Sequence, residues 1–124
     1  MRTRNNTSRA PVEFTDRTRI EAELGKGGLH WLEGLLDTIQ GQVAEDGPAL
    51  KSIKVCPIQD AEILVWHRTG IYFQFDSSFK EADRALKQFY PLIDLELARL
   101  PSTKRYKVAR QLFFDIETPD ESAP

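Results

Sequence analysis

Three neighbouring side chains offer the clearest chance of chemistry in this sequence: His67, Arg68 and Tyr72. An imidazole can act as a general base, a guanidinium can hold a phosphate, and a phenol can orient either group, so the trio would suit phosphodiester chemistry. The sequence has no nucleophile elbow, paired-cysteine zinc spacing, His-Glu-x-x-His or dinucleotide fingerprint. We therefore assign no catalytic residue, no metal ligand and no cofactor, and we favour a non-enzymatic protein.

Composition is that of a globular domain, with 40% hydrophobic and 29% charged residues among 124. The lone cysteine, Cys56, rules out an internal disulfide, which predicts a reducing compartment. The first residues lack the apolar segment of a secretory signal, and no apolar run reaches membrane-spanning length. We expect a cytoplasmic protein that does not enter a membrane.

Charge is distributed unevenly along the chain, although the net charge is only −2. Residues 20–48 hold six acids against Lys26, a net of −5, whereas residues 101–114 hold four bases and no acid. A near-neutral total argues against extensive nucleic-acid coating. The acidic block, which includes Glu33 and Asp37, would suit a basic partner, and the basic block leaves local phosphate contacts open.

The stretch that must organise the fold is the helix expected over residues 78–100. Ser78 followed by Glu81 fits a capping box, and Pro91 predicts a kink in the middle of the helix. Apolar residues three or four apart form one stripe: Phe79, Ala82, Leu86, Phe89, Ile93, Leu97 and Leu100. Tyr90, Leu92 and Leu95 lie off that stripe, which fits either a wider buried face or a homodimer contact through this helix.

Upstream of this helix, the pattern predicts a short strand at residues 12–15 and two helices at 16–24 and 29–44. Gly25 would end the first helix in the left-handed conformation. Period-two patterning then predicts strands at residues 50–56, 61–68 and 71–76, with turns at residues 57–60 and at Thr69-Gly70.

The face that the hairpin turns away from its core is unusually apolar in this interpretation. A two- or four-residue loop at Thr69-Gly70 would place His67 opposite Tyr72 and Val65 opposite Gln74. That face would be covered by residues 101–118 or would bind a partner. Residues 103–116 fit a helix or a strand, and we prefer the helix.

Together these elements predict an α+β domain over residues 11–116, in the order β-α-α-β-β-β-α-α. Its three- to four-stranded, mostly antiparallel sheet would carry the helices on one face. Residues 1–10 are expected to be a disordered basic arm and residues 117–124 a disordered acidic tail.

The order of a short strand, two helices, three meandering strands and a closing helix resembles that of RelE/ParE-type bacterial toxins. The resemblance covers element order only, across residues 12–100. It implies messenger cleavage or gyrase inhibition, with His67, Arg68 and Tyr72 on the last strands.

Our leading hypothesis is a small protein-binding module, such as a regulator, an inhibitor or an immunity-type protein, acting on a basic protein partner. The residues expected to bind it are Glu33, Asp37, Val65, His67, Tyr72, Gln74 and Tyr90. The alternative is a nucleic-acid-directed protein, such as a RelE-like ribonuclease, whose contacts would include Arg68, Arg105, Lys107 and Arg110.

Overall fold

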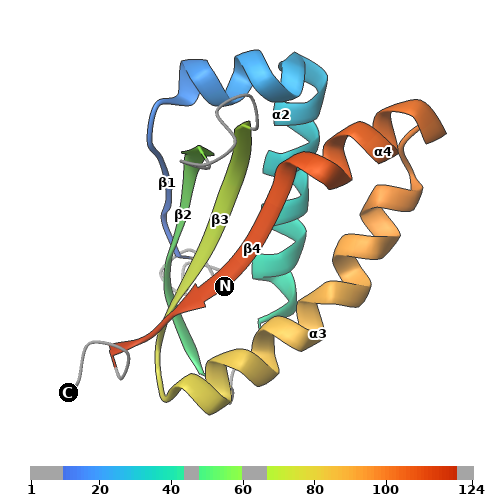
Figure 1. The fold of residues 1–124 in the computed structure, drawn as a ribbon. Helices are drawn as coiled ribbons and strands as arrows, with labels where there is room; N and C mark the ends of the chain where they lie inside the picture. Colours follow the sequence, from blue (N-terminus) through green and yellow to red (C-terminus); the bar gives the residue numbers. More distant parts are fainter. Residues whose placement is uncertain (1–9, 44–47, 60–66, 120–124) are drawn as a thin grey trace, which may run out of the picture.

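The computed structural model describes residues 10–43, 48–59 and 67–119. Over these residues it confirms an α+β fold in which three helices lie on one face of an open four-stranded sheet (Figure 1). In chain order, the described elements are β1 (Val12–Phe14), α2 (Arg17–Gln42), β2 (Ala49–Gln59), β3 (His67–Asp76), α3 (Phe79–Ala98), α4 (Ser102–Gln111) and β4 (Leu112–Glu117). The predicted arm and tail lie largely outside the described residues.

The sheet is mixed rather than mostly antiparallel. Its strand order is β1-β2-β3-β4, with β1 parallel to β2, β2 antiparallel to β3, and β3 parallel to β4. The parallel pairs arise because α2 connects β1 to β2, and α3 with α4 connects β3 to β4. Such helical crossovers return the chain in its original direction.

The predicted turn at residues 57–60 is wrong over residues 57–59, which belong to β2. Pro57 is paired with Thr69, and Ile58 with Arg68. A proline inside a strand lacks one ladder donor, but here the loss is harmless. The Thr15 N–H donates to the Val55 carbonyl at 2.9 Å, and β1 ends at Phe14, so Pro57 faces a side where no described strand continues.

The predicted hairpin turn at Thr69-Gly70 is also wrong, because both residues lie inside β3. Gly70 is opposite Cys56, and its missing side chain leaves room for neighbours. A Cβ there would lie 2.5 Å from Ile58 Cδ1 and 2.7 Å from Tyr72 Cε2. This glycine therefore permits close packing over the strand rather than a reversal of the chain.

The two predicted N-terminal helices are one element with a break. Gly25 has φ +80° and ψ 162°, which confirms the predicted positive φ, yet the helix resumes at once. Asp16 caps its start by accepting from the Arg19 N–H. The buried stripe of α2 contains Ile20, Leu24, Leu29, Leu32, Leu35, Leu36 and Ile39.

The α3 helix follows the sequence prediction closely. The Glu81 N–H donates to Ser78 Oγ at 3.2 Å, and the helix continues through Pro91. Ala82, Leu86, Phe89 and Ile93 are buried, with Phe89 packed on Phe73 at a ring distance of 5.1 Å. Phe79 is the exception on the predicted stripe, because it is 47% exposed.

The preference for a helix throughout residues 103–116 is wrong from Leu112 onward. There the period changes to two: Leu112 and Ile116 are buried, and the Phe114 ring stacks on Phe73 at 6.3 Å. Residues 101–118 consequently do not cover the second sheet face, since β4 extends the sheet itself (Figure 1). No described helix is long and apolar enough to span a membrane.

Candidate functional site

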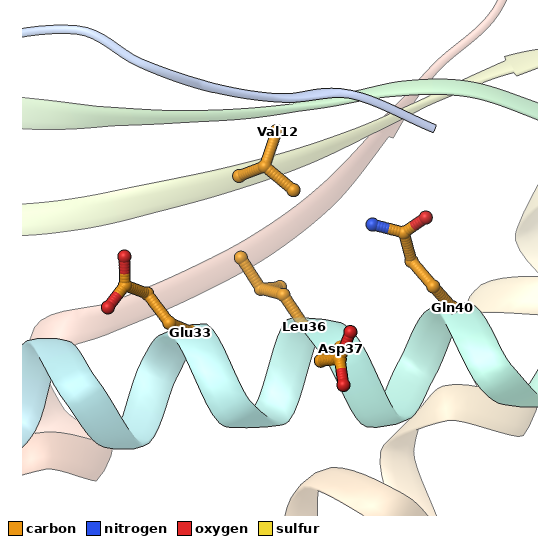
Figure 2. A pocket seen from close by; sticks show the side chains of 5 residues that line it. All are labelled: Val12, Glu33, Leu36, Asp37 and Gln40. Atoms are coloured by element: carbon orange, nitrogen blue, oxygen red, sulfur yellow. The ribbon is translucent and has the colours of Figure 1, made fainter. Parts of the chain in front are cut away.

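A groove lies between β1 and α2, at the edge of the sheet (Figure 2). It has a volume of about 190 Å³. Val12 and Leu36 give it an apolar floor, and three polar side chains of α2 surround that floor. We call it the β1 groove, and its lining residues are Val12, Glu33, Leu36, Asp37 and Gln40.

The periodicity of α2 places these polar groups beside the core rather than inside it. Leu36 is 2% exposed and belongs to the buried stripe. At about 100° per residue, Glu33, Asp37 and Gln40 are all rotated from Leu36 in the same sense around the helix, so they share the flank that meets β1. Gln40 also fixes the chain before β1, because its Oε1 accepts from the Ala10 N–H at 2.8 Å.

One end of the β1 groove already holds a cation from the same chain. Arg17 Nη2 lies 2.7 Å from Glu33 Oε2, and the Arg17 guanidinium carbon lies 4.5 Å from the centre of the Phe14 ring. Both charged side chains are over 40% exposed, so this ion pair contributes little to stability. It does show that carboxylate and ring can accommodate a guanidinium together.

The opposite face of the sheet, which we call the open face, carries Tyr72 and Gln74. They alternate along β3 with the buried residues Ile71, Phe73 and Phe75. Gln74 connects three strands, because it contacts Ser52 Oγ and donates from Nε2 to Glu117 Oε1 at 2.7 Å. These side-chain hydrogen bonds connect β2, β3 and β4 across the open face.

The apolar part of the open face gathers around Gly70. The Tyr72 and Phe113 rings meet edge to face at 6.2 Å, and Cys56 lies opposite Gly70 in the sheet. Burial, and then the Glu117 carboxylate, raises the pKa of the Cys56 thiol, while Lys54 partly offsets them. Burial also raises the pKa of Tyr72, helped by Cys56 and Asp115. Neither group is poised to ionise near neutral pH.

The structure divides the predicted partner-binding residues among separate surfaces. Glu33 and Asp37 share the β1 groove, whereas Tyr72 and Gln74 share the open face. Tyr90, 43% exposed, lies on α3. Val65 lies outside the described residues.

The predicted pairing of His67 with Tyr72 is wrong. Position 67 begins β3 and pairs with position 59, while Tyr72 pairs with Lys54. The two residues lie five positions apart in one strand instead of facing each other across a hairpin. The catalytic trio inferred from their spacing therefore loses its geometric basis.

Of the four predicted nucleic-acid residues, the three arginines have structural partners. Arg105 donates to the carbonyls of Leu97, Ala98 and Leu100, so it caps the end of α3. Arg68 Nη2 donates to the Leu112 carbonyl at 3.1 Å, and its guanidinium lies 5.5 Å from the Phe113 ring centre. The Arg110 guanidinium lies 5.3 Å from the Tyr106 ring centre, and Lys107 is exposed on α4.

Sequence reasoning missed Val12, Leu36, Gln40 and Arg17 as parts of one site. The helical flank that contains Glu33 and Asp37 also contains Gln40, three positions further along, which was an available signal. The proximity of Val12 and Arg17 depends on where β1 docks. Local patterning does not reveal that position.

Among the described residues, no group of three or more metal-ligating side chains gathers into a possible metal site. Comparison with protein-family models, curated proteins and solved structures finds no match for this chain. The element order that resembles RelE/ParE toxins is also altered, because residues 49–76 contribute two described strands and the last strand follows the closing helices.

Proposed function

We propose that this protein is a small, non-enzymatic binding module that holds a basic segment of a partner protein in the β1 groove. The observation that carries the proposal is the groove itself, an apolar floor of Val12 and Leu36 beside the carboxylates of Glu33 and Asp37. Arg17 supports it, because a guanidinium already binds Glu33 at 2.7 Å. A regulator, inhibitor or immunity-type role is compatible with such a module.

The direct test is binding of a labelled peptide rich in lysine, measured by fluorescence anisotropy with wild type and with the double variant Glu33→Lys, Asp37→Lys. Reversing both charges replaces attraction with repulsion, so we expect affinity to fall at least about tenfold. A matched control, Asp76→Lys with Asp94→Lys, makes the same charge change at two exposed acids outside the groove. Equal losses in the two double variants would contradict the proposal.

A second candidate function is contact with single-stranded nucleic acid. Two arginine–aromatic pairs support it: Arg68 with Phe113, and Arg110 with Tyr106, a residue that is 66% exposed. Stacked rings beside guanidinium groups are a common platform for unpaired bases. Binding of a labelled oligonucleotide that falls steeply with salt and is lost in Arg110→Ala would favour this candidate. Binding that changes neither with salt concentration nor in Arg110→Ala would exclude this candidate.

We also propose that α3 can contribute a homodimer contact. Its support is the exposure of two large apolar side chains, Tyr90 at 43% and Leu95 at 55%. Sedimentation of wild type and of Leu95→Lys tests this directly. A dimer that dissociates in the variant agrees with the proposal, and a wild-type monomer at high concentration contradicts it.

A further inference from the structure

The outer edge of β1 has unpaired backbone groups among the described residues. β1 begins the sheet order, so β2 is the one described strand that pairs with it. The Pro11 carbonyl accepts from the Ile53 N–H at 2.9 Å, and the Thr15 N–H donates to the Val55 carbonyl at 2.9 Å. Backbone groups alternate in direction along a strand, so Val12 and Phe14 direct theirs away from β2.

This edge is accessible as well as unpaired. The Val12 side chain is 36% exposed, and Glu13 is exposed beside it. An exposed strand edge is a template for another strand, which adds by main-chain hydrogen bonds and is selected by its side chains. An extended segment placed there would direct every second side chain toward α2.

The spacing of the acids on α2 matches the spacing of side chains on such a segment. Same-face residues of a strand lie about 6.8 Å apart. Glu33 and Asp37 are four residues apart in a helix, which separates them by about 6 Å along the axis. Figure 2 shows β1 running beside this stretch of α2, with Val12 facing Leu36 at a point between Glu33 and Asp37. Two successive same-face side chains would therefore each meet one carboxylate.

We propose that the partner's segment binds as an added strand on β1, with lysine or arginine at two alternate positions facing Glu33 and Asp37 and β-branched residues between them. This inference rests on the function proposed above and adds the backbone pairing and the sequence pattern. The first basic side chain exchanges with Arg17 at Glu33, since that carboxylate already accepts a guanidinium. Asp37 also has an interaction in the unbound protein, so the second basic side chain competes with that interaction.

The test uses an acetylated, amidated nine-residue peptide of alternating lysine and valine, with two N-methylated versions. One version carries N-methyl groups on the lysine residues and the other on the valine residues. Because the N–H groups of alternate residues point to opposite sides of a strand, only one set can bond to β1. We expect one version to bind at least about tenfold more weakly than the parent and the other to stay within about twofold.

The N-methylated version that binds more weakly also shows whether the peptide pairs parallel or antiparallel to β1. The backbone N–H and carbonyl of Val12 point away from β2, while its side chain lines the β1 groove. In an antiparallel pair the directly opposed residue shares that face and bonds to Val12, so methylated lysine would be disruptive. In a parallel pair the bonding residues flank that position, so methylated valine would be disruptive.

Failure of the inference and failure of the proposed function give different results. If the parent peptide binds, loses affinity in Glu33→Lys, Asp37→Lys, and tolerates both N-methylated versions equally, strand addition is overturned while groove binding stands. If the parent peptide does not bind wild type, both are overturned. A scrambled peptide with the same composition should bind at least about threefold more weakly than the alternating one, and equal binding would overturn the sequence pattern.

Discussion

β1 and β4 both end the sheet, yet their outer backbone groups are bonded differently. At β1, the backbone N–H and carbonyl groups of Val12 and Phe14 point away from the sheet, beside a groove lined with carboxylates. At β4, the Leu112 carbonyl accepts from Arg68 Nη2 at 3.1 Å, and the Ile116 N–H donates to Asp115 Oδ1 at 2.8 Å. Side chains of the same molecule thus occupy groups that another strand would need.

This difference gives the two edges opposite roles. Proteins commonly protect sheet edges from unwanted pairing with charged side chains, and Arg68 and Asp115 provide that protection at β4. Among the described residues, what protects β1 is its short length of three residues, which limits how much backbone it can offer. Under the proposed function, the short edge with acidic neighbours selects its partner by charge, whereas two outward backbone groups of the longer aromatic edge are already bonded.

The largest effect is expected from exposing the outer backbone groups of β4, which would make that edge able to pair with another strand. In the double variant Arg68→Ala, Asp115→Ala, the Leu112 carbonyl and the Ile116 N–H lose their side-chain partners. We expect a larger assembly than wild type at the same concentration, measured by sedimentation velocity. The control Lys54→Ala, Asp76→Ala also removes one base and one acid, but neither side chain bonds to the β4 backbone among the described contacts. An unchanged mass distribution in the β4 variant would contradict the protective role.

Substitution of Gly70 tests whether the region around β3 contributes to stability and not to peptide binding. In Gly70→Ala the new methyl group would meet Ile58 Cδ1 and Tyr72 Cε2, so we expect a loss of about 1–3 kcal/mol in the free energy of unfolding. Urea titration measures this loss. Ile58→Val removes the nearest clashing atom, so the double variant should lose less than the sum of the single ones. Peptide affinity at β1 should stay unchanged in this variant. A loss of both stability and peptide affinity would contradict the assignment of binding to β1 alone.

Arg17 forms an ion pair with Glu33 in the unbound protein, so it competes with a basic partner for that carboxylate. Arg17→Ala removes this competing cation, so we expect a basic peptide to bind about two- to fivefold more tightly. The matched control is Arg19→Ala, which changes the net charge equally but removes the ion pair with Glu23 instead. Anisotropy titrations of both variants suffice. Weaker binding in Arg17→Ala would show that Arg17 helps to hold the partner.

Cys56 lies in β2 on the open face, between the two edges, so its reactivity shows whether a peptide binds that face instead of an edge. Burial raises the pKa of its thiol, so less thiolate is present in the folded protein at neutral pH than in the unfolded chain. Alkylation by iodoacetamide should be slower in native than in urea-unfolded protein, and the native rate should rise as pH increases through the raised pKa. Saturating peptide should change the native rate by less than about twofold, because Cys56 lies on neither edge. Strong protection would place the peptide on the open face.

The parts of the fold that the sequence predicts well are governed by local interactions. The start of α3 depends on Ser78 and Glu81, which bond within one turn, and its buried stripe depends on spacing alone. Gly25 was recognised because its positive φ suits glycine. The position of Gly70 depended instead on Ile58, twelve residues away, so a turn and a packed strand were indistinguishable locally.

The site was predicted in part for the same reason. Glu33 and Asp37 stand out as acids on the flank of an amphipathic helix. Their relation to Val12 requires the parallel pairing of β1 with β2 across α2, a contact that no short pattern encodes. The parallel addition of β4 was missed in the same way, because Leu112 to Glu117 follow a helix directly and pair with a strand about forty residues earlier.

The most direct measurement is an NMR titration of the isotopically labelled protein with the alternating lysine–valine peptide, following backbone amide shifts. We expect the largest changes at Val12 and Phe14 on β1 and at Glu33, Asp37 and Gln40 on α2, with smaller changes along β4. Changes concentrated at Tyr72 and Phe113 or on α4, with β1 unaffected, would contradict the assignment of the β1 groove as the binding site.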